Sequence, residues 1–138
     1  MRHEYWDVSM LKYILKLTVM HQFKKLKIWQ KSMELALKIY KVTDRFPVEE
    51  KFGLSQQIRR SAVSVPSNIS EGAGRRSEKE FSHFLNVAYG SSCELETQLI
   101  LAYKIGFINN HTCEILCKEI NEIQKMTFAI NKTKPDDQ

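Results

Sequence analysis

The sequence is poor in the residues that interrupt helices or cross-link chains, with 5 Gly, 3 Pro and 3 Cys among 138 residues. So few Gly and Pro argue against a loop-rich or collagen-like chain, and a hydrophobic fraction of 43% is too high for a disordered one. The odd number of cysteines (Cys93, Cys113 and Cys117) argues against a disulfide framework and favours a reducing, cytoplasmic setting. The length supports one compact domain.

The sequence also lacks an uninterrupted apolar run of about 18 residues, the length that a membrane-spanning helix needs. The fairly apolar segment 10–20 is interrupted by Lys12 and Lys16, and no small-residue cleavage site follows it, so it does not match a signal peptide. Alternating apolar and polar residues and tight hairpin turns are absent as well, which argues against a β-sheet. We therefore expect a helical protein without a membrane partner.

Helical periodicity is the strongest positive signal, and it divides the chain into four helices. The first spans residues 23–46 and has an apolar arc wider than half its circumference, and the second begins near Ser55, a candidate N-cap residue. Ser77 and Glu80 form a capping-box pattern that opens the third helix, and the fourth opens at residues 110–112. Because the connections are short, the sequence predicts an all-α fold, an antiparallel up-down four-helix bundle.

The boundaries and one irregularity of this bundle follow from local signals. Pro66 cannot donate to the carbonyl of Ala62, so the second helix is expected to be kinked or broken there. The bundle is expected to occupy residues 23–131, and residues 132–138 are expected to be a disordered tail. Residues 1–22 fit the scheme poorly: they form either an extra amphipathic helix or an upstream translation before a true start at Met20.

Core positions follow from the same periodicity. On the first helix the apolar side is centred on Leu26, Trp29, Met33, Ala36, Leu37 and Tyr40, and is extended by Ile28, Leu35, Ile39, Val42 and Phe46. The core lines of the other three helices are Ile58, Ala62, Val65 and Ile69; Phe81, Phe84, Ala88, Ser92, Leu95, Leu99 and Ala102; and Leu116, Ile120, Ile123, Thr127 and Ile130.

Positive charge is concentrated on the first helix. Residues 23–46 hold seven bases and two acids, a net charge of +5 that equals the net charge of the whole chain. Such a stripe is typical of a surface that neutralises phosphates, and equally of a solvated face that keeps a protein soluble. Six of these bases lie within an arc of about 100°: Lys24, Lys27, Lys31, Lys38, Lys41 and Arg45.

Polar side chains flank the core lines of the second and third helices. The favoured interpretation is a hydrogen-bonded network that holds the helices in register, and the alternative is an RNA or ligand site. This set comprises Gln57, Ser64, Asn68, Glu71, Glu94 and Gln98. Arginine's planar fork suits phosphate, so four arginines are further candidates for nucleic-acid contact, although Arg75 could instead pair with a carboxylate: Arg59, Arg60, Arg75 and Arg76.

No pattern for catalysis, metal or cofactor binding is present. Glu80 and His83 make one half of a di-iron motif whose second half is missing. His111, Cys113 and Cys117 fall close together on a helix, but a fourth ligand is not evident. Nucleophile triads, phosphate loops and dinucleotide fingerprints are also absent. We therefore expect a non-enzymatic protein without a cofactor.

The run from Gln57 to Arg75, QIRRSAVSVPSNISEGAGR, resembles the signature of the bacterial four helix bundle protein family. That family includes proteins encoded in the intervening sequences of 23S ribosomal RNA genes. The chain is also similar to the accessory variability determinant of diversity-generating retroelements. The stretches LKIWQKS at 26–32 and GSSCELETQL at 90–99 fit in order, so the resemblance covers roughly residues 23–130. Ser61 and Ser70 replace expected alanines, and Cys93 replaces an apolar or small residue.

The resemblance implies a four-helix protomer that assembles into a ring-like homopentamer. Relatives in retroelements bind nucleic acid and a reverse transcriptase, whereas most members have no assigned activity. Independently, the small residues Gly90, Ser91 and Ser92 and the wide apolar arc of the first helix predict self-association. Two functions follow: an oligomeric accessory protein that binds RNA or DNA through a basic face, or a scaffold for a neighbour-encoded partner such as a reverse transcriptase.

Overall fold

The computed structural model describes residues 7–11 and 22–132, and all regular secondary structure in these residues is helical. Residues 8–11 form a helical turn. The remaining elements follow in this order: η1 (Phe23–Lys25), α2 (Lys27–Thr43), η2 (Val48–Glu50), α3 (Leu54–Ala73), α4 (Glu78–Lys104) and α5 (Asn110–Lys132). The prediction of an all-α protein is confirmed for the described part of the chain.

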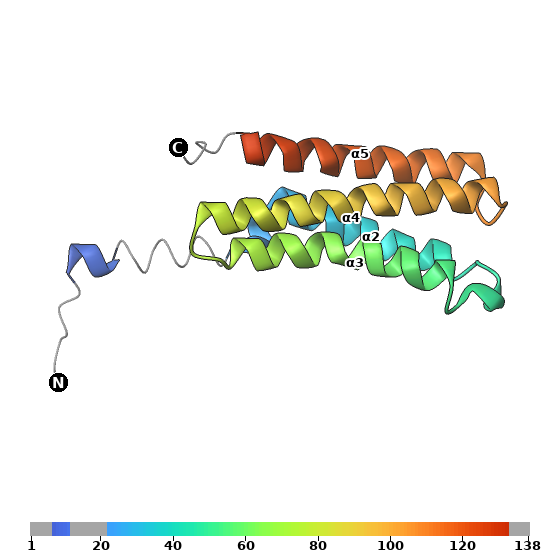
Figure 1. Cartoon of the computed structure of the whole chain (residues 1–138), viewed down its shortest axis with the longest axis horizontal. Helices are drawn as coiled ribbons and strands as arrows, with labels where there is room; N and C mark the ends of the chain where they lie inside the picture. The colour runs from blue at the N-terminus through green and yellow to red at the C-terminus, as the bar shows by residue number, and fades with distance from the viewer. Residues whose placement is uncertain (1–6, 12–21, 133–138) are drawn as a thin grey trace.

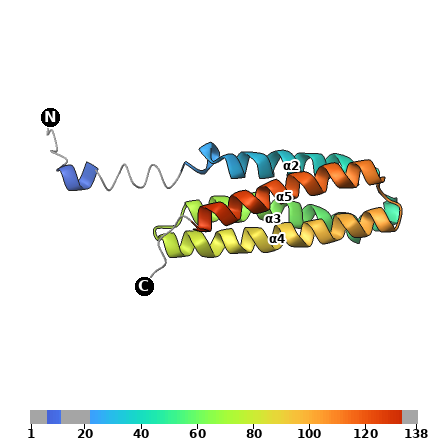
Figure 2. The same cartoon turned by 90° about the horizontal axis from the view of Figure 1, so that it is seen from above.

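The four long helices lie side by side along one axis and form a helical bundle (Figures 1 and 2). α3 packs against both α2 and α4, and α5 packs against α4 and α2. Each connection returns the chain at one end of the bundle, with η2 and the α4–α5 connection at one end and the α3–α4 connection at the other (Figure 1). No helix among the described residues is both long and apolar enough to cross a membrane.

Aliphatic side chains from all four helices fill the interior of the bundle. Each fully buried large side chain contributes about 1.5–3 kcal/mol through removal of apolar surface from water. The predicted core line of α3 is confirmed in full, and on α4 Leu85 takes the innermost position, while its neighbour Phe84 is half-buried. The largest fully buried residues are Ile28, Ile39, Ile58, Ile69, Leu85, Leu95, Leu99, Ile120 and Ile123.

The predicted core side of α2 is partly wrong. Ile28, Leu35 and Ile39 face the core, whereas Met33, Leu37 and Tyr40 are 38%, 63% and 44% exposed. The reason is geometric, because the helices packed against α2 cover only part of an apolar arc that exceeds half the circumference. The remaining apolar residues of α2 lie in solvent beside α3.

The predicted N-cap of α3 is wrong, and of the kink or break expected at Pro66 the break is not present. The helix begins at Leu54 with Gly53 as the N-cap residue, and Ser55 is buried in the first turn. Glu50 Oε2 accepts a hydrogen bond from the Leu54 amide at 3.0 Å, so a carboxylate from η2 supplies the cap. The helix is not broken at Pro66 but continues to Ala73. Packing against α2 and α4 offsets the roughly 3 kcal/mol that an internal proline costs.

Two glycines and one serine set the ends of α4 and its distance from α3. Ser77 Oγ accepts a hydrogen bond from the Glu80 amide at 3.1 Å, which confirms the predicted N-cap. Gly106, after the helix, has a φ of +90°, which favours glycine. A Cβ atom at Gly72 would lie 2.7 Å from Phe84 Cβ, so this glycine allows close approach of α3 and α4.

Most of the predictions for the two ends of the chain lie outside the described residues. Within the segment 1–22, residues 7–11 form a helical turn in which the Asp7 carboxylate accepts hydrogen bonds from Ser9 Oγ at 2.6 Å and from the Met10 amide at 2.7 Å. At the other end, Lys132 is the last residue of α5. The expected disordered tail otherwise falls beyond it.

Candidate nucleic-acid interface

Two lysines of the predicted basic stripe pair with α5. Lys31 Nζ lies 3.4 Å from Glu122 Oε2, and Lys38 Nζ donates to Glu119 Oε1. The hydrogen bond to Glu119, together with the attraction of its charge, raises the pKa of the Lys38 ammonium. The edge of α2 that faces α5 is thereby partly neutralised, and the sequence did not reveal these partners.

The other four bases of the stripe are exposed, and within residues 22–132 no carboxylate forms an ion pair with them. Lys24 contributes its backbone carbonyl, which accepts a hydrogen bond from Gln30 Nε2 at 2.8 Å. These cations are free to meet an external anion. They are Lys24, Lys27, Lys41 and Arg45.

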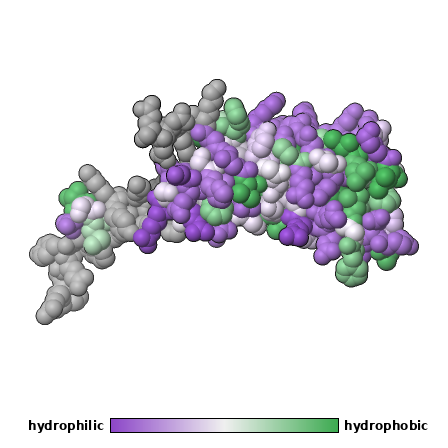
Figure 3. Space-filling model, viewed as in Figure 1, coloured by the Kyte–Doolittle hydropathy of each residue, from purple (hydrophilic) through white to green (hydrophobic). Residues whose placement is uncertain are grey.

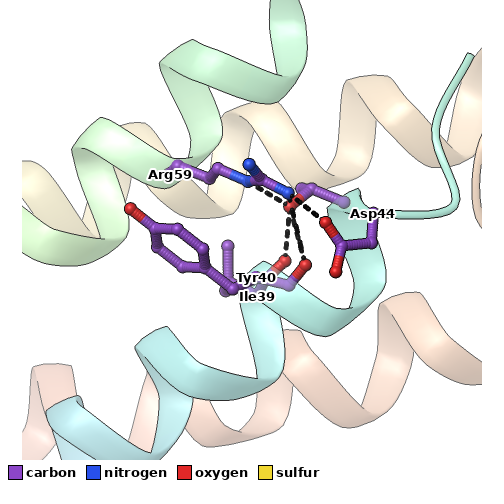
Figure 4. Close-up of polar contacts among 5 residues, drawn as sticks. Ile39, Tyr40, Asp44 and Arg59 are labelled. Carbon is purple, nitrogen blue, oxygen red and sulfur yellow. Dashed lines mark hydrogen bonds and ion pairs between the residues drawn. The ribbon is translucent and has the colours of Figure 1, made fainter. Parts of the chain in front are cut away.

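Arg59 is held by polar groups of α2 and is half-buried (Figure 4). Its Nε donates to Thr43 Oγ1 at 2.8 Å, and one terminal nitrogen donates to Asp44 Oδ1 at 2.7 Å and to the Tyr40 carbonyl at 3.4 Å. The guanidinium also lies 4.7 Å from the centroid of the Tyr40 ring, within the range of a cation–π contact. These contacts fix the plane of Arg59 and join α2 to α3.

Arg60 lies beside Arg59 in a cleft of about 580 Å³ at the η2 end of the bundle. Tyr40 and Phe52 contribute two aromatic rings to the lining of the cleft, and Lys51, Arg59 and Arg60 contribute three cationic side chains. Lys51 Nζ lies 5.5 Å from the centroid of the Phe52 ring. Sequence reasoning identified the arginines but missed Lys51 and Phe52, which belong to a turn without helical periodicity.

Arg75 and Arg76 belong to the α3–α4 connection, at the opposite end of the bundle from η2 (Figure 1). Arg75 pairs with Glu71 at 2.9 Å and lies 4.9 Å from the centroid of the Phe84 ring. Arg76 is exposed, and no ion pair to it is present in the described residues. The ten predicted basic residues therefore spread along the molecule and do not form one compact patch.

Two polar residues of α3, Ser64 and Asn68, form hydrogen bonds with neighbouring groups. Ser64 Oγ lies 2.8 Å from Ser91 Oγ, so this hydroxyl pair joins α3 to α4. Asn68 Nδ2 donates to the carbonyl and to the hydroxyl of Ser64, at 2.8 and 3.0 Å. Ser91, noted in the sequence only as a small residue, is the polar partner across the interface.

The remaining members of the predicted polar set lie apart from this pair. Gln98 Nε2 donates to Glu94 Oε1 at 3.2 Å within α4, while Gln98 Oε1 is buried without a partner in the described part of the chain. Glu71 pairs with Arg75, as above, and Gln57 is exposed. In the described residues, five of the six thus form separate local contacts, and no single hydrogen-bonded network joins all six.

An open apolar groove of about 380 Å³ runs between α2 and α3, on the other side of α2 from α5. Phe23 and Trp29 meet edge to face at one end, with ring centroids 5.2 Å apart. The exposed part of the α2 apolar arc forms one wall, and α3 forms the other. The lining residues are Phe23, Trp29, Met33, Ala36, Leu37, Tyr40, Val63, Pro66, Ser67 and Ser70.

Apolar surface also gathers at the end of the bundle where η2 and the α4–α5 connection lie (Figure 3). Exposed residues of these segments include Val48 in η2, Phe52 just after it, and Leu101 and Ile105 at the end of α4. The α2–α3 groove and this end of the bundle are therefore two of the places where the described residues expose apolar area.

The thiols and the histidine motif do not form a metal site. Among the described residues no three His, Cys, Asp or Glu side chains come close enough to hold a metal ion. Cys113 Sγ and Cys117 Sγ lie 3.9 Å apart on α5. Burial, with the neighbouring Cys113, raises the pKa of the Cys117 thiol to about 12, so this thiol stays protonated and poorly nucleophilic.

The family model of the 23S rRNA-intervening sequence proteins matches residues 24–129. The chain belongs to this family. The resemblance noted in the sequence is thus confirmed, and the match to the 23S rRNA-intervening sequence proteins includes all of α2, α3 and α4 and most of α5. A comparison with curated proteins finds no match.

This chain is similar to a protein from Bacteroides thetaiotaomicron whose crystal structure is known. It is described as a protein with unknown function from the S23 ribosomal protein family. The two chains share 31% sequence identity with a TM-score of 0.70, and the similarity covers 77% of this chain and 99% of that one. Neither description names a reaction.

Proposed function

We propose that this protein is a non-enzymatic, self-associating, antiparallel four-helix bundle that binds nucleic acid, RNA in particular, in the cytoplasm. The observation that carries the proposal is the charge of α2 and its flanks, which holds the whole positive excess of the chain. Four of its cations are exposed and have no ion pair in the described residues. Such cations bind phosphates by releasing counterions.

Self-association is the second part of the proposal, and the α2–α3 groove supports it. Leu37 and Met33 leave apolar surface beside α3 that the described residues do not cover. A second copy seated there would remove this surface from water and bring several basic edges together, which multiplies the local charge. The family resemblance suggests a ring of five.

Filter binding of labelled RNA across a salt series tests the nucleic-acid part. Affinity should fall steeply with salt, with a slope of about −0.9 per phosphate neutralised on a duplex. The double variant Lys27→Gln plus Lys41→Gln neutralises two cations that form no ion pair in the described residues and should weaken binding strongly. Lys31→Gln plus Lys38→Gln, which alters the lysines already paired with α5, is the matched control and should weaken it less. Binding that ignores salt would refute the electrostatic proposal.

Light scattering tests self-association independently of RNA. Leu37→Asp places a charge in the groove and should reduce the mass of the particle, whereas Val48→Asp, outside the groove, should leave it unchanged. A wild-type protein that stays monomeric at high concentration would contradict this part of the proposal.

The groove also favours a second candidate function, a scaffold for a neighbour-encoded protein such as a reverse transcriptase. An apolar groove between two helices is suited to an apolar helix face from a partner. Pull-down with and without nuclease separates the two functions. A partner that stays bound after nuclease treatment, and is lost in Leu37→Asp, would support the scaffold.

A further inference from the structure

We propose that the cleft beside η2 binds one unpaired nucleotide of a single-stranded nucleic acid, with the base stacked on Phe52 and the phosphate held by Arg60 and Lys51. This inference rests on the proposed nucleic-acid function and assigns it a second site, distinct from the α2 edge that faces α5. The cleft of about 580 Å³ falls within the range of roughly 300–1,000 Å³ that is usual for ligand pockets.

Phe52 provides an aromatic face that the fold does not use. Phe52 is 82% exposed. Among the described residues its ring contacts the Lys51 ammonium, which lies 5.5 Å from the ring centroid. A core role does not account for so exposed a ring. Stacking on an aromatic side chain is how proteins commonly hold unpaired bases, because every base has a flat π-face.

Arg59 adds a rigid wall to the same cleft. Its bonds to Thr43 and Asp44 and its stacking on Tyr40 fix the guanidinium plane before any ligand arrives (Figure 4). Guanidinium planes also stack on bases, and a fixed plane loses little entropy on binding. The cleft is therefore preorganised on the Arg59 side and open on the Phe52 side.

The charge of the cleft suits a phosphate. Arg60 and Lys51 are exposed, and in the part of the chain that the structure describes no carboxylate forms an ion pair with either. Two acids of the neighbouring segments are already engaged, because Asp44 binds Arg59 and Glu50 caps α3, while Glu49 forms no ion pair in the described residues. An anion with a flat apolar face thus meets both features of the cleft, and a nucleotide is such an anion.

A single strand is favoured over a duplex because both faces of a paired base are covered by its neighbours. Stacking on Phe52 needs a base that can be splayed out, as in a loop or a free end. The lysine edge of α2, in contrast, meets phosphates of either form. The two sites therefore predict different preferences within one protein.

Fluorescence anisotropy with a labelled oligoadenylate, alone and paired with oligouridylate, tests the inference on the full chain. Phe52→Ala should weaken binding of the single strand by roughly 5- to 150-fold and leave the duplex unchanged. The salt slope should stay the same in Phe52→Ala, because stacking releases no counterions. Phe52→Tyr should retain binding, and Arg60→Gln should lower the slope on the single strand by about 0.7.

Val48→Ala is the matched control, because Val48 is the first residue of η2, is 83% exposed and does not line the cleft. An equal loss in Val48→Ala, an equal loss on the duplex, or a lower particle mass of Phe52→Ala without RNA would overturn the stacking site. Unchanged single-strand binding by Phe52→Ala would also overturn the stacking site. In that case, salt-dependent binding of nucleic acid by the wild type would still support the proposed function. A wild type that binds neither form would refute both.

Discussion

The two edges of α2 hold charge in different ways. On the α3 edge, Arg59 is half-buried and is fixed by Thr43, Asp44 and the ring of Tyr40. On the α5 edge, the exposed Lys31 and Lys38 each reach a single glutamate at the end of a flexible side chain, the exposed Glu122 and the half-buried Glu119. A half-buried, multiply bonded arginine stabilises a helix interface, whereas exposed pairs contribute little and exchange partners readily. The α5 edge is therefore the one whose cations an external phosphate can compete for.

The largest effect on stability is expected from a change on the buried side of α2, which anchors both of its edges to the bundle. Ile39→Ala deletes a fully buried side chain of α2 and should lower the free energy of unfolding by about 2–5 kcal/mol. Leu37→Ala, two residues away but largely exposed, should change it by about 0.5 kcal/mol or less. Urea denaturation of both variants measures the difference, and equal losses would contradict the division of α2 into buried and exposed apolar sides.

A change at the α3 edge alone should have the next largest effect on stability. Arg59→Ala removes hydrogen bonds to Thr43 and Asp44 and the stacking on Tyr40, and should destabilise the protein by about 1–3 kcal/mol. Arg60→Ala, at the adjacent exposed position, is the control and should be nearly neutral. Chemical denaturation of the two variants at the same salt concentration checks this, and a neutral Arg59→Ala would remove the distinction between the two edges.

A change at the α5 edge should affect binding more than stability. Glu119→Gln plus Glu122→Gln releases Lys38 and Lys31, so RNA affinity should rise and the salt slope on a duplex should steepen by up to about 1.8. The control, Glu78→Gln plus Glu114→Gln, removes the same charge from glutamates that form no ion pair with a lysine in the described residues. Equal gains in both would mean that net charge alone, not the α5 edge, sets affinity.

The smallest effect is expected from alkaline pH. Because Glu119 raises the pKa of Lys38, the contribution of this pair is fully present below the ordinary lysine value of 10.5 and is lost as pH rises through the higher folded value. The methionine of Lys38→Met cannot titrate. The difference in thermal stability between the wild type and this variant should therefore shrink between pH 9 and pH 11, because the wild type loses the contribution of the pair. Thermal unfolding of both proteins across this interval measures the convergence, and a constant difference would refute it.

Features that depend on residues close in the chain were predicted well from the sequence. The Ser77 cap needs only a glutamate three residues on, and the core lines of α3 and α5 follow from spacing along one helix. The N-cap of α3 was wrongly assigned to Ser55 because the cap comes from Glu50, in a preceding turn that has no periodic signal. Pro66 was expected to kink or break α3, and the helix is not broken because packing against two neighbouring helices outweighs the lost hydrogen bond.

The candidate site was less predictable because its contacts join residues far apart in the chain. Lys38 lies 81 positions from Glu119, and Lys31 lies 91 positions from Glu122. Periodicity within α2 places these lysines on one arc but contains no information about the side chains of α5. Phe52 was overlooked for a related reason. An aromatic residue in a turn does not by itself indicate a binding site, and only the tertiary structure places it in one cleft with Arg59 and Arg60.

The sequence by itself determined that the chain is helical, roughly where each helix lies, and that the positive excess belongs to α2 and its flanks. Only the tertiary structure decided which lysines are paired and which apolar residues of α2 remain in solvent. The physical reason is that spacing along a helix defines its faces, whereas the docking of α3 and α5 chooses which of those faces is covered.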